Sequence, residues 1–303
     1  MNSQAPSVSV VIPVRNGAAT IVEQLQALAA QDHTGRWEVV VADNGSTDTT
    51  AKIVHAFART APMPVRHVDA SSRPGASHAR NVGAINASGD ILAFCDCDDR
   101  VNGGWVSAAT TTQPGEVLAG ILKPLSTPQD PAAPVLHPDG FVQAATRRTL
   151  MSCNFSIWRS DYLSVGGFDE SLPPYGFEDT EFAIRLQDRG LRLNGSREML
   201  VYYRLPRQGR GLMRKIYLSA KAETVLWQRH PSMASGAGMR WAALQVARLP
   251  LDVFRLVAES PRRVVREVIT RWGRLVAMCE IRAHRYPDEP LLVDASAPTE
   301  GTA

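Results

Sequence analysis

Three aspartates, Asp96, Asp98 and Asp99, follow the apolar residues 91–95. Side chains alternate between the two faces of a strand, so a strand that continues through residue 98 places Asp96 and Asp98 on one face. Two carboxylates on one face repel each other unless a cation lies between them. Mg²⁺ and Mn²⁺ take oxygen ligands and are often shared with substrate phosphates. The sequence therefore predicts a divalent-metal site at these aspartates, although an isolated Asp-x-Asp also suits a solvated acidic turn.

The elements that would position these carboxylates alternate between strand and helix patterns over the first hundred residues. Apolar or β-branched runs predict strands at 8–12, 37–42, 65–68 and 90–94, and helical spacing predicts a helix after each of the first three. Ser46 is the expected N-cap of the second helix. This alternation predicts an α/β protein with a parallel sheet covered by helices. Ligands of such sheets bind beyond the carboxyl ends of the strands.

The second half of the chain is less regular. Residues 123–140 are rich in proline, which favours a long loop. Strands are predicted at 150–157 and 199–203, and a helix is predicted from Glu178 to Arg189 with Gly190 just beyond its end. Further helices are predicted at 212–227 and, with breaks near prolines, over 240–285, and residues 294–303 are expected to be disordered.

Composition argues against one class of function, nucleic-acid binding. The chain has 303 residues, 44% of them hydrophobic and 21% charged, with a net charge of +3, which is ordinary for a globular protein. The basic surplus lies in residues 240–286, and residues 1–239 are nearly neutral. A balanced body argues against nucleic acid as the ligand, because nucleic-acid binders usually show a basic face across the domain.

The cysteines and the first residues suggest an intracellular, cytoplasmic protein. The four cysteines, at 95, 97, 153 and 279, have none of the paired spacings of a zinc site or a disulfide framework. Residues 1–6 have no basic or apolar region of a signal peptide, and no stretch is apolar enough for a spanning helix. We therefore expect reduced thiols and a protein that works inside the cell.

Six short motifs follow one another in a characteristic order. They are V-I-P-V-R-N at 11–16, A-D-N-G-S-T-D at 42–48, G-A-S-H-A-R-N at 75–81, D-C-D-D at 96–99, G-F-D-E at 167–170 and G-F-E-D at 176–179. Each motif is weak alone, but the ordered set closely resembles the family 2 glycosyltransferases. These are inverting enzymes built on the nucleotide-diphospho-sugar transferase (GT-A) fold. The resemblance covers residues 7–205.

The resemblance implies a division of the chain. We expect a GT-A fold with a mostly parallel sheet flanked by helices and a C-terminal helical segment. The expected parts are an N-terminal tail at 1–6, a nucleotide-sugar-binding half at 7–110, an acceptor-binding and catalytic half at 111–210, a helical segment at 211–286 and a disordered tail at 287–303.

Residues for the nucleotide donor are carried over motif by motif. Asp43 is expected to accept a hydrogen bond from the base or ribose, although an Asp before Asn-Gly is also a common turn former. Arg80 can neutralise phosphate oxygens through forked hydrogen bonds, although it is also one of many surface arginines. The full expected set for the donor is Pro13, Val14, Arg15, Asn16, Asp43, Arg80, Asn81 and Asp96.

Asp179 is the expected catalytic base, with Glu178 as the next candidate. An inverting transferase needs one carboxylate to take the proton from the acceptor hydroxyl as its oxygen attacks the anomeric carbon. A cation at Asp96, Asp98 and Asp99 would offset the charge on the leaving diphosphate. Acidic residues are also enriched in the first turn of a helix without any catalytic role. His78 and residues 168–170 are expected to be structural, with Phe168 in the core.

Two departures from the family pattern narrow the expected activity. Many relatives carry a histidine just after the last strand of the sheet that can join the metal or phosphate site, but this chain has Tyr202, Tyr203 and Arg204 there. The Q-x-x-R-W signature of polymerising members is absent after residue 205. The sequence therefore favours transfer of a single sugar.

The expected substrates follow from the resemblance. We expect a UDP-sugar donor, with GDP- and dTDP-sugars as alternatives, Mn²⁺ or Mg²⁺ as cofactor, and a glycan or lipid-linked acceptor. A sugar-1-phosphate nucleotidyltransferase and a non-catalytic sugar-nucleotide-binding subunit are the competing functions. The first usually has a Gly-rich loop with Arg and Lys after the first strand, where this chain has only Arg15-Asn16-Gly17. The presence of both Asp98 and Asp179 argues against the second.

The C-terminal helical segment combines an apolar stripe with many arginines. The apolar residues are Val264, Val265, Val268, Trp272, Leu275, Val276 and Cys279. A basic amphipathic helix can lie on an anionic membrane surface, which would suit a lipid-linked acceptor and a position on the inner face of the cell membrane. Packing on its own domain explains the same stripe and is the commoner outcome.

Overall fold

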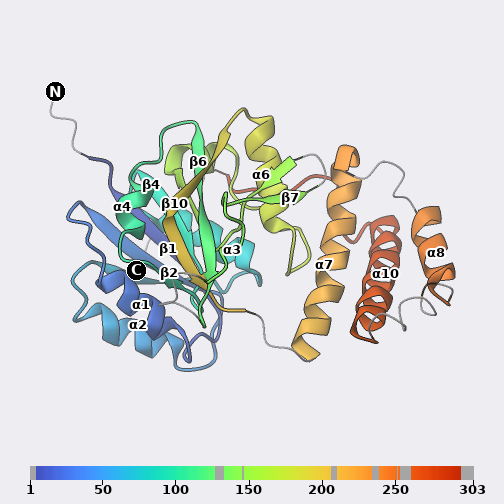
Figure 1. Cartoon of the computed structure of the whole chain (residues 1–303), viewed down its shortest axis with the longest axis horizontal. Coiled ribbons are helices and arrows are strands. Elements are labelled where there is room, and N and C mark those ends of the chain that lie inside the picture. The colour runs from blue at the N-terminus through green and yellow to red at the C-terminus, as the bar shows by residue number, and fades with distance from the viewer. Residues whose placement is uncertain are drawn as a thin grey trace.

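The computed structural model describes residues 5–126, 133–144, 147–205, 210–233, 239–250, 252 and 261–294. Its centre is an eight-stranded sheet in the order β3-β2-β1-β4-β9-β6-β10-β5 (Figure 1). β9 is antiparallel to both of its neighbours, β5 is antiparallel to β10, and the remaining pairs are parallel. The strands are β1 Val8–Val14, β2 Trp37–Asp43, β3 Val65–Asp69, β4 Ile91–Cys95, β5 Arg100–Val101, β6 Glu116–Pro124, β9 Asn154–Trp158 and β10 Arg192–Tyr203.

The helices cover both faces of this sheet. Over the first hundred residues, strands and helices alternate as the sequence predicted. Two short strands, β7 Val142–Ala144 and β8 Arg147–Thr149, pair with each other outside the main sheet. The helices of the sheet domain are α1 Ile21–Ala29, α2 Thr50–Ala58, α3 Ala76–Asn86, α4 Trp105–Ala109, α5 Arg159–Ser164 and α6 Glu178–Asp188. The second helix begins after Thr49, so Ser46 is not its N-cap; the Ser46 hydroxyl instead accepts a hydrogen bond from the Asn16 amide.

The core has two parts, one on each face of the sheet. Alternate residues of β1 show the division, because Val10 and Ile12 pack with α1, α2 and α4, whereas Val11 packs with α3, α5 and α6. The second part contains five fully buried aromatic side chains in mutual contact, with the Phe94 and Phe155 rings stacked 4.5 Å apart. This aromatic group comprises Phe94, Phe155, Tyr162, Phe168 and Phe182. The group links β4, through Phe94, with α6, through Phe182.

Three helices follow the sheet at its far end: α7 Arg210–Arg229, α8 Met239–Ala247 and α10 Pro261–Arg282. α10 packs on α7 and α8 (Figure 1). Lys221 Nζ of α7 lies 2.6 Å from Glu280 Oε2 of α10, and Arg274 of α10 bonds Glu223 of α7 at 2.8 Å. α10 therefore packs within the chain through one side, but this side is not the predicted stripe, because four of the seven stripe residues, Val265, Val268, Trp272 and Cys279, are exposed. No helix in the described ranges is both long and apolar enough to cross a membrane.

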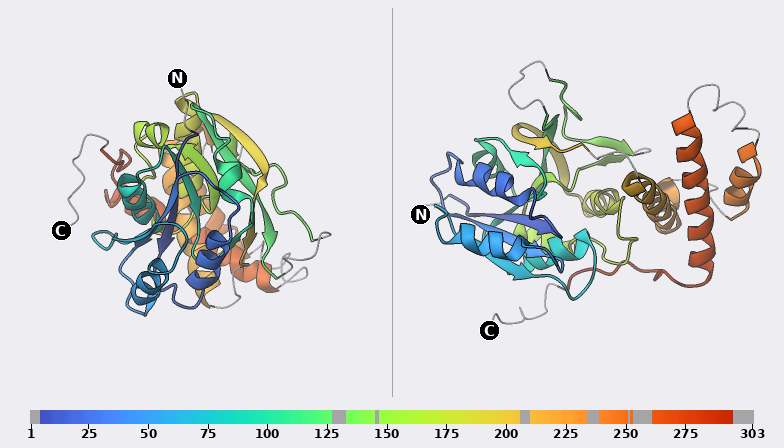
Figure 2. Two further views of the ribbon diagram at one scale, coloured as in Figure 1. Left: turned by 90° about the vertical axis from the view of Figure 1, so that its left-hand side faces the viewer. Right: turned by 90° about the horizontal axis from the view of Figure 1, so that it is seen from below.

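The chain then returns to the sheet domain. After α10, residues 287–294 run back towards the sheet (Figure 2), where the Leu291 amide donates to Asp169 and the Val293 amide donates to the Gly166 carbonyl. The expectation of a disordered tail from residue 287 is therefore wrong for 287–294, because these residues form backbone hydrogen bonds with the loop after α5. We call residues 287–294 the return segment. Residues 295–303 lie outside the described part of the chain.

Candidate functional site

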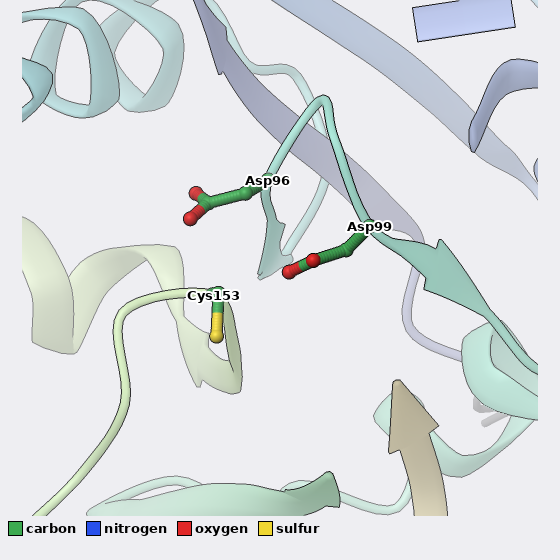
Figure 3. Close-up of side chains that lie close together, drawn as sticks. All are labelled: Asp96, Asp99 and Cys153. Carbon is green, nitrogen blue, oxygen red and sulfur yellow. The ribbon is translucent and has the colours of Figure 1, made fainter. Parts of the chain in front are cut away.

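The strand that carries the acidic motif ends earlier than the sequence suggested. β4 stops at Cys95, and residues 96–99 form a turn, so strand alternation does not continue through them. The expectation that Asp96 and Asp98 share a strand face is therefore wrong. The turn instead brings Asp96 and Asp99 to Cys153, and one ligand atom of each lies within 4.8 Å of the others (Figure 3). Asp98 is exposed.

Asp99 is the most deeply buried carboxylate of this group, with 1% of its surface exposed. Its Oδ1 accepts a hydrogen bond of 2.8 Å from the Arg204 amide, whereas its buried Oδ2 has no partner among the described residues. Burial, followed by the charge of Asp96, raises the pKa of Asp99 to about 8. A buried carboxylate oxygen without a partner, next to a second carboxylate and a thiol, fits a bound divalent cation.

Arg204 holds the acidic turn in place. Its guanidinium donates through Nε to the Asp98 carbonyl at 2.7 Å and through Nη2 to Glu23 on α1 at 2.8 Å. Its backbone amide bonds Asp99. Arg204 directly follows β10, the last strand of the sheet, and contacts the turn through both its backbone and its side chain.

Arg80 connects the acidic turn with the start of α6. It lies on α3, is 3% exposed, and donates from Nη2 to Asp96 Oδ1 at 2.9 Å. Its Nη1 lies 3.6 Å from Glu178 Oε1, and its guanidinium lies over the Phe168 ring. Two of its nitrogens, Nε and Nη1, have no hydrogen-bond partner among the described residues. A buried guanidinium with free donors can bind an anionic group.

The expected catalytic pair lies in the first turn of α6. Phe177 precedes it with φ of 65°, a left-handed conformation that turns the chain sharply into the helix. Asp179 Oδ1 accepts a bond of 2.7 Å from the Thr180 amide. Burial, followed by the negative charge of Glu178, raises the pKa of Asp179 to about 7. A carboxylate with such a pKa is suited to take a proton near neutral pH.

Two cavities meet at the Arg80–Asp96 ion pair. The first, of about 490 Å³, contains Glu178 and Asp179 and is walled mainly by apolar side chains; we call it the Asp179 cavity. The second, of about 710 Å³, contains Asp98; we call it the Asp98 cavity. Arg80 and Asp96 line both. The expected donor residues Pro13, Val14, Arg15 and Asn16 all line the Asp98 cavity.

Two expected donor residues lie outside both cavities. Asp43 is 6% exposed, and its oxygens accept from the Ser46 amide at 2.7 Å and contact His67 Nε2 at 3.0 Å. Burial raises the pKa of Asp43, but the hydrogen bonds from Ser46 and His67 outweigh it, and the net shift is downwards. The geometry thus gives Asp43 a part in holding the loop after β2.

Asn81 is a buried structural hub. Its amide donates to the Phe168 carbonyl and to Glu170, and its oxygen accepts from the Tyr162 hydroxyl and the Phe168 amide. Every hydrogen-bonding group of the side chain is used within the protein, which leaves none for a nucleotide. The side chain of His78, which bonds Ser72 and Glu170, contributes to the same structure, as expected.

The structure also adds residues that sequence reasoning did not select. Arg214 and Lys215 of α7 line the Asp98 cavity, and Lys215 Nζ lies 4.8 Å from the centre of the Tyr175 ring. Cys153 and Arg204 contact the acidic turn. Among these four, only Arg204 had a signal in the sequence, because it lies in the stretch 202–204 where the family pattern led us to look for a histidine and this chain has none.

Comparisons with known proteins agree with this geometry. Residues 9–111 match the family model described as glycosyl transferase family 2, and residues 143–207 match the model described as N-terminal domain of galactosyltransferase. The chain is 31% identical over 235 residues to validoxylamine A glucosyltransferase of Streptomyces hygroscopicus subsp. jinggangensis. That match covers 65% of this chain and 55% of the relative, so the chain spans about half the length of this curated protein.

Solved structures show the same fold. The mannosyltransferase PcManGT from Pyrobaculum calidifontis, in complex with GDP-Man and Mn²⁺, superposes with a TM-score of 0.65 at 18% identity, covering 92% of this chain and 87% of that one. TarS residues 1–349 from S. aureus, in complex with UDP-GlcNAc, superposes with a TM-score of 0.54 at 18% identity, and the match covers 96% of this chain and 97% of that one. The expected GT-A fold and the resemblance to family 2 glycosyltransferases are thereby confirmed.

Proposed function

We propose that this chain, whose residues 9–111 match the glycosyl transferase family 2 model, transfers a single sugar from a nucleotide-diphospho-sugar to an acceptor hydroxyl with inversion. The observation that carries the proposal is the pairing of the two cavities. The Asp179 cavity holds a carboxylate whose pKa is raised to about 7, and the Asp98 cavity holds acidic and basic groups suited to a metal diphosphate. The cavities meet at Arg80 and Asp96, where the reacting atoms of donor and acceptor would lie.

The residues of the chain have distinct roles in this reaction. Asp179, with Glu178 as its neighbour, takes the proton of the acceptor hydroxyl, and the oxygen forms a bond to the anomeric carbon as the bond to the diphosphate breaks. Arg80, Arg214 and Lys215 offset the charge of the departing nucleoside diphosphate. Asp96, Asp98 and Asp99 would hold the cation, which supplies further electrostatic stabilisation of that diphosphate.

The donor and acceptor are proposed by class. A UDP-sugar is the first candidate, with GDP- and dTDP-sugars as alternatives, because residues 13–16 would pass along the base mainly through their backbone. The acceptor is a glycan or a lipid-linked glycan. The similar structures contain UDP-GlcNAc in one case and GDP-Man with Mn²⁺ in another, which supports a nucleotide sugar and a divalent cation in general terms.

A thermal-shift screen of nucleotide sugars with and without Mn²⁺ tests the donor and the cation together. We expect one nucleotide class to raise the melting temperature only when Mn²⁺ is present, because ligands that bind the native state stabilise it. Release of the nucleoside diphosphate on addition of glycan acceptors then measures transfer. The nucleotidyltransferase alternative is tested by incubating the protein with a nucleoside triphosphate and the 1-phosphate of the donor's sugar, and we expect no nucleotide sugar to form. Stabilisation without turnover on any acceptor would favour the non-catalytic binding subunit.

We further propose that α10 contacts an anionic membrane surface through its outward side. One side of the helix packs on α7 and α8, but Val265, Val268 and Trp272 on the other side are 44%, 36% and 56% exposed. Exposed basic residues, Arg266, Arg282 and Arg285, lie on the same helix and just beyond its end. A large exposed tryptophan beside basic residues is typical of helices that lie at a lipid interface.

Vesicle sedimentation tests the membrane contact. Sedimented protein should increase with the fraction of anionic lipid, since each basic residue near such a surface contributes about 1 kcal/mol. It should fall at high salt, where the Debye length shrinks to about 3 Å at 1 M. Trp272→Ser should reduce binding, whereas Leu244→Ser, a matched change at an exposed apolar residue of α8, should not. Wild-type protein that stays in the supernatant with anionic vesicles at low salt would exclude the contact.

A further inference from the structure

The Cys153 sulfur lies close to the carboxylates of the acidic turn (Figure 3). It lies in the loop just before β9, is 7% exposed, and is held there because Asn154 bonds the Ile121 and Met199 carbonyls. Its sulfur forms one cluster with the carboxylates of Asp96 and Asp99, with the three ligand atoms within 4.8 Å of one another (Figure 3). Two carboxylates and a thiol at this spacing are the donor set of a cation site.

A second, independent observation points to a ligand in the same place. Only 1% of the surface of Asp99 is exposed, yet its Oδ2 has no hydrogen-bond partner among the described residues. Figure 3 shows the Asp99 carboxylate directed from the turn towards the space between Asp96 and Cys153. Burying a carboxylate oxygen without a partner costs free energy unless a bound ligand, such as a cation, contacts that oxygen.

We propose that the Cys153 thiolate is a ligand of the divalent cation, together with carboxylate oxygens of Asp96 and Asp99. The proposal rests on the glycosyltransferase function proposed above, in which this cation serves the donor diphosphate. When the cation binds, the sulfur–metal bond replaces the sulfur–hydrogen bond and the proton passes to solvent. Asp98 lies outside this cluster, in the Asp98 cavity, from where it would complete the site on the donor side.

A sulfur ligand changes which cation the site prefers. Mg²⁺ is a hard ion that takes oxygen ligands and keeps several waters, whereas Mn²⁺, Zn²⁺ and Cd²⁺ accept a thiolate progressively better. A site with Asp96, Asp99 and Cys153 should therefore discriminate against Mg²⁺ more strongly than three carboxylates would. Cys153 thus acts as the residue that determines the cation, while the aspartates supply most of the negative charge.

Cadmium titration tests the ligand directly, because a cadmium–thiolate bond gives an ultraviolet charge-transfer band that carboxylates do not give. Wild-type protein, without nucleotide, should develop the band and saturate at one equivalent of Cd²⁺. Cys153→Ser should lose the band. Cys279→Ser removes the exposed cysteine of α10 and is the matched control; it should keep the band. Asp99→Asn should keep the band but bind Cd²⁺ more weakly.

A calorimetric comparison of Mn²⁺ and Mg²⁺ gives a second readout. The ratio of the two affinities should fall by about tenfold or more from wild type to Cys153→Ser, as expected for loss of a group that tunes a metal site. A melting curve without metal shows whether that variant is folded. A wild-type band that survives in Cys153→Ser, or an unchanged ratio of affinities in the folded variant, would overturn the proposal. Failure of sugar transfer in protein that shows the band would instead count against the proposed function.

Discussion

Asp179→Asn should lower the turnover number for sugar transfer by about 10²–10⁴-fold, the usual contribution of one general base, while donor affinity stays nearly unchanged. The substitution keeps the shape of the side chain and its contact with Thr180, but it removes the basicity. The measurement is the steady-state rate of nucleoside diphosphate release, with donor affinity determined separately by calorimetry. Asp188→Asn, at an exposed residue of the same helix, is the control and should behave as wild type.

The pH dependence gives the same residue a second test. Burial and the charge of Glu178 raise the pKa of Asp179 to about 7, and a base acts only when it is deprotonated. The value of kcat/KM should therefore rise with pH by about tenfold per unit below this pKa and level off above it. In Asp179→Asn that acidic limb should be absent from the residual rate. Wild-type turnover in the variant would move the role of base to Glu178.

Asp98→Ala should bring donor affinity in the presence of Mn²⁺ down to the level measured without metal. Losing even an outer partner of a metal ligand costs about 10–100-fold in metal affinity, so losing a ligand should cost at least as much. The fold should persist, because Asp98 is exposed and its backbone carbonyl, which bonds Arg204, remains.

The matched control for this variant is Asp69→Ala, which removes another exposed aspartate at the carboxyl end of a strand of the same sheet. It should leave donor affinity and its metal dependence unchanged. Donor affinity in Asp98→Ala that still responds to Mn²⁺ as in wild type would remove Asp98 from the cation site and leave Asp96, Asp99 and Cys153 as its ligands.

The first four strands and three helices were predictable from the sequence because buried parallel strands are continuous apolar runs. The same logic failed at the acidic motif, where β4 ends at Cys95 and a turn replaces the expected alternation. β6 was missed although residues 116–124 contain an apolar run, because its neighbours in the sheet, β9 and β10, come from much later in the chain. Pairing between distant segments leaves little local trace.

The residues of the candidate site also fall into those that the sequence predicted and those that only the fold brings together. Residues carried by ordered motifs, such as Arg80 and Asp179, were found from the sequence and lie at the cavities. Asp43 and Asn81 occur in the same motifs, but their side chains bond groups within the protein and line neither cavity, which residue type alone does not reveal. Cys153, Arg214 and Lys215 reach the site only because the loop before β9 and the helix α7 fold over it.

The return segment affects the order in which parts of this protein fold during synthesis. The carboxylate of Asp169 is fully buried and accepts hydrogen bonds from the Arg229 guanidinium and the Leu291 amide. Leu291 lies 122 residues after Asp169 in the sequence. During synthesis the loop after α5 therefore leaves the ribosome long before its last hydrogen-bond donor exists. The aromatic group of the core can assemble early, but the surroundings of Asp169 are completed only after residue 291 has been made. A ribosome-stalled chain that ends before residue 291 should accordingly show a locally protease-sensitive loop after α5, and a chain that includes residues 287–294 should have that loop protected.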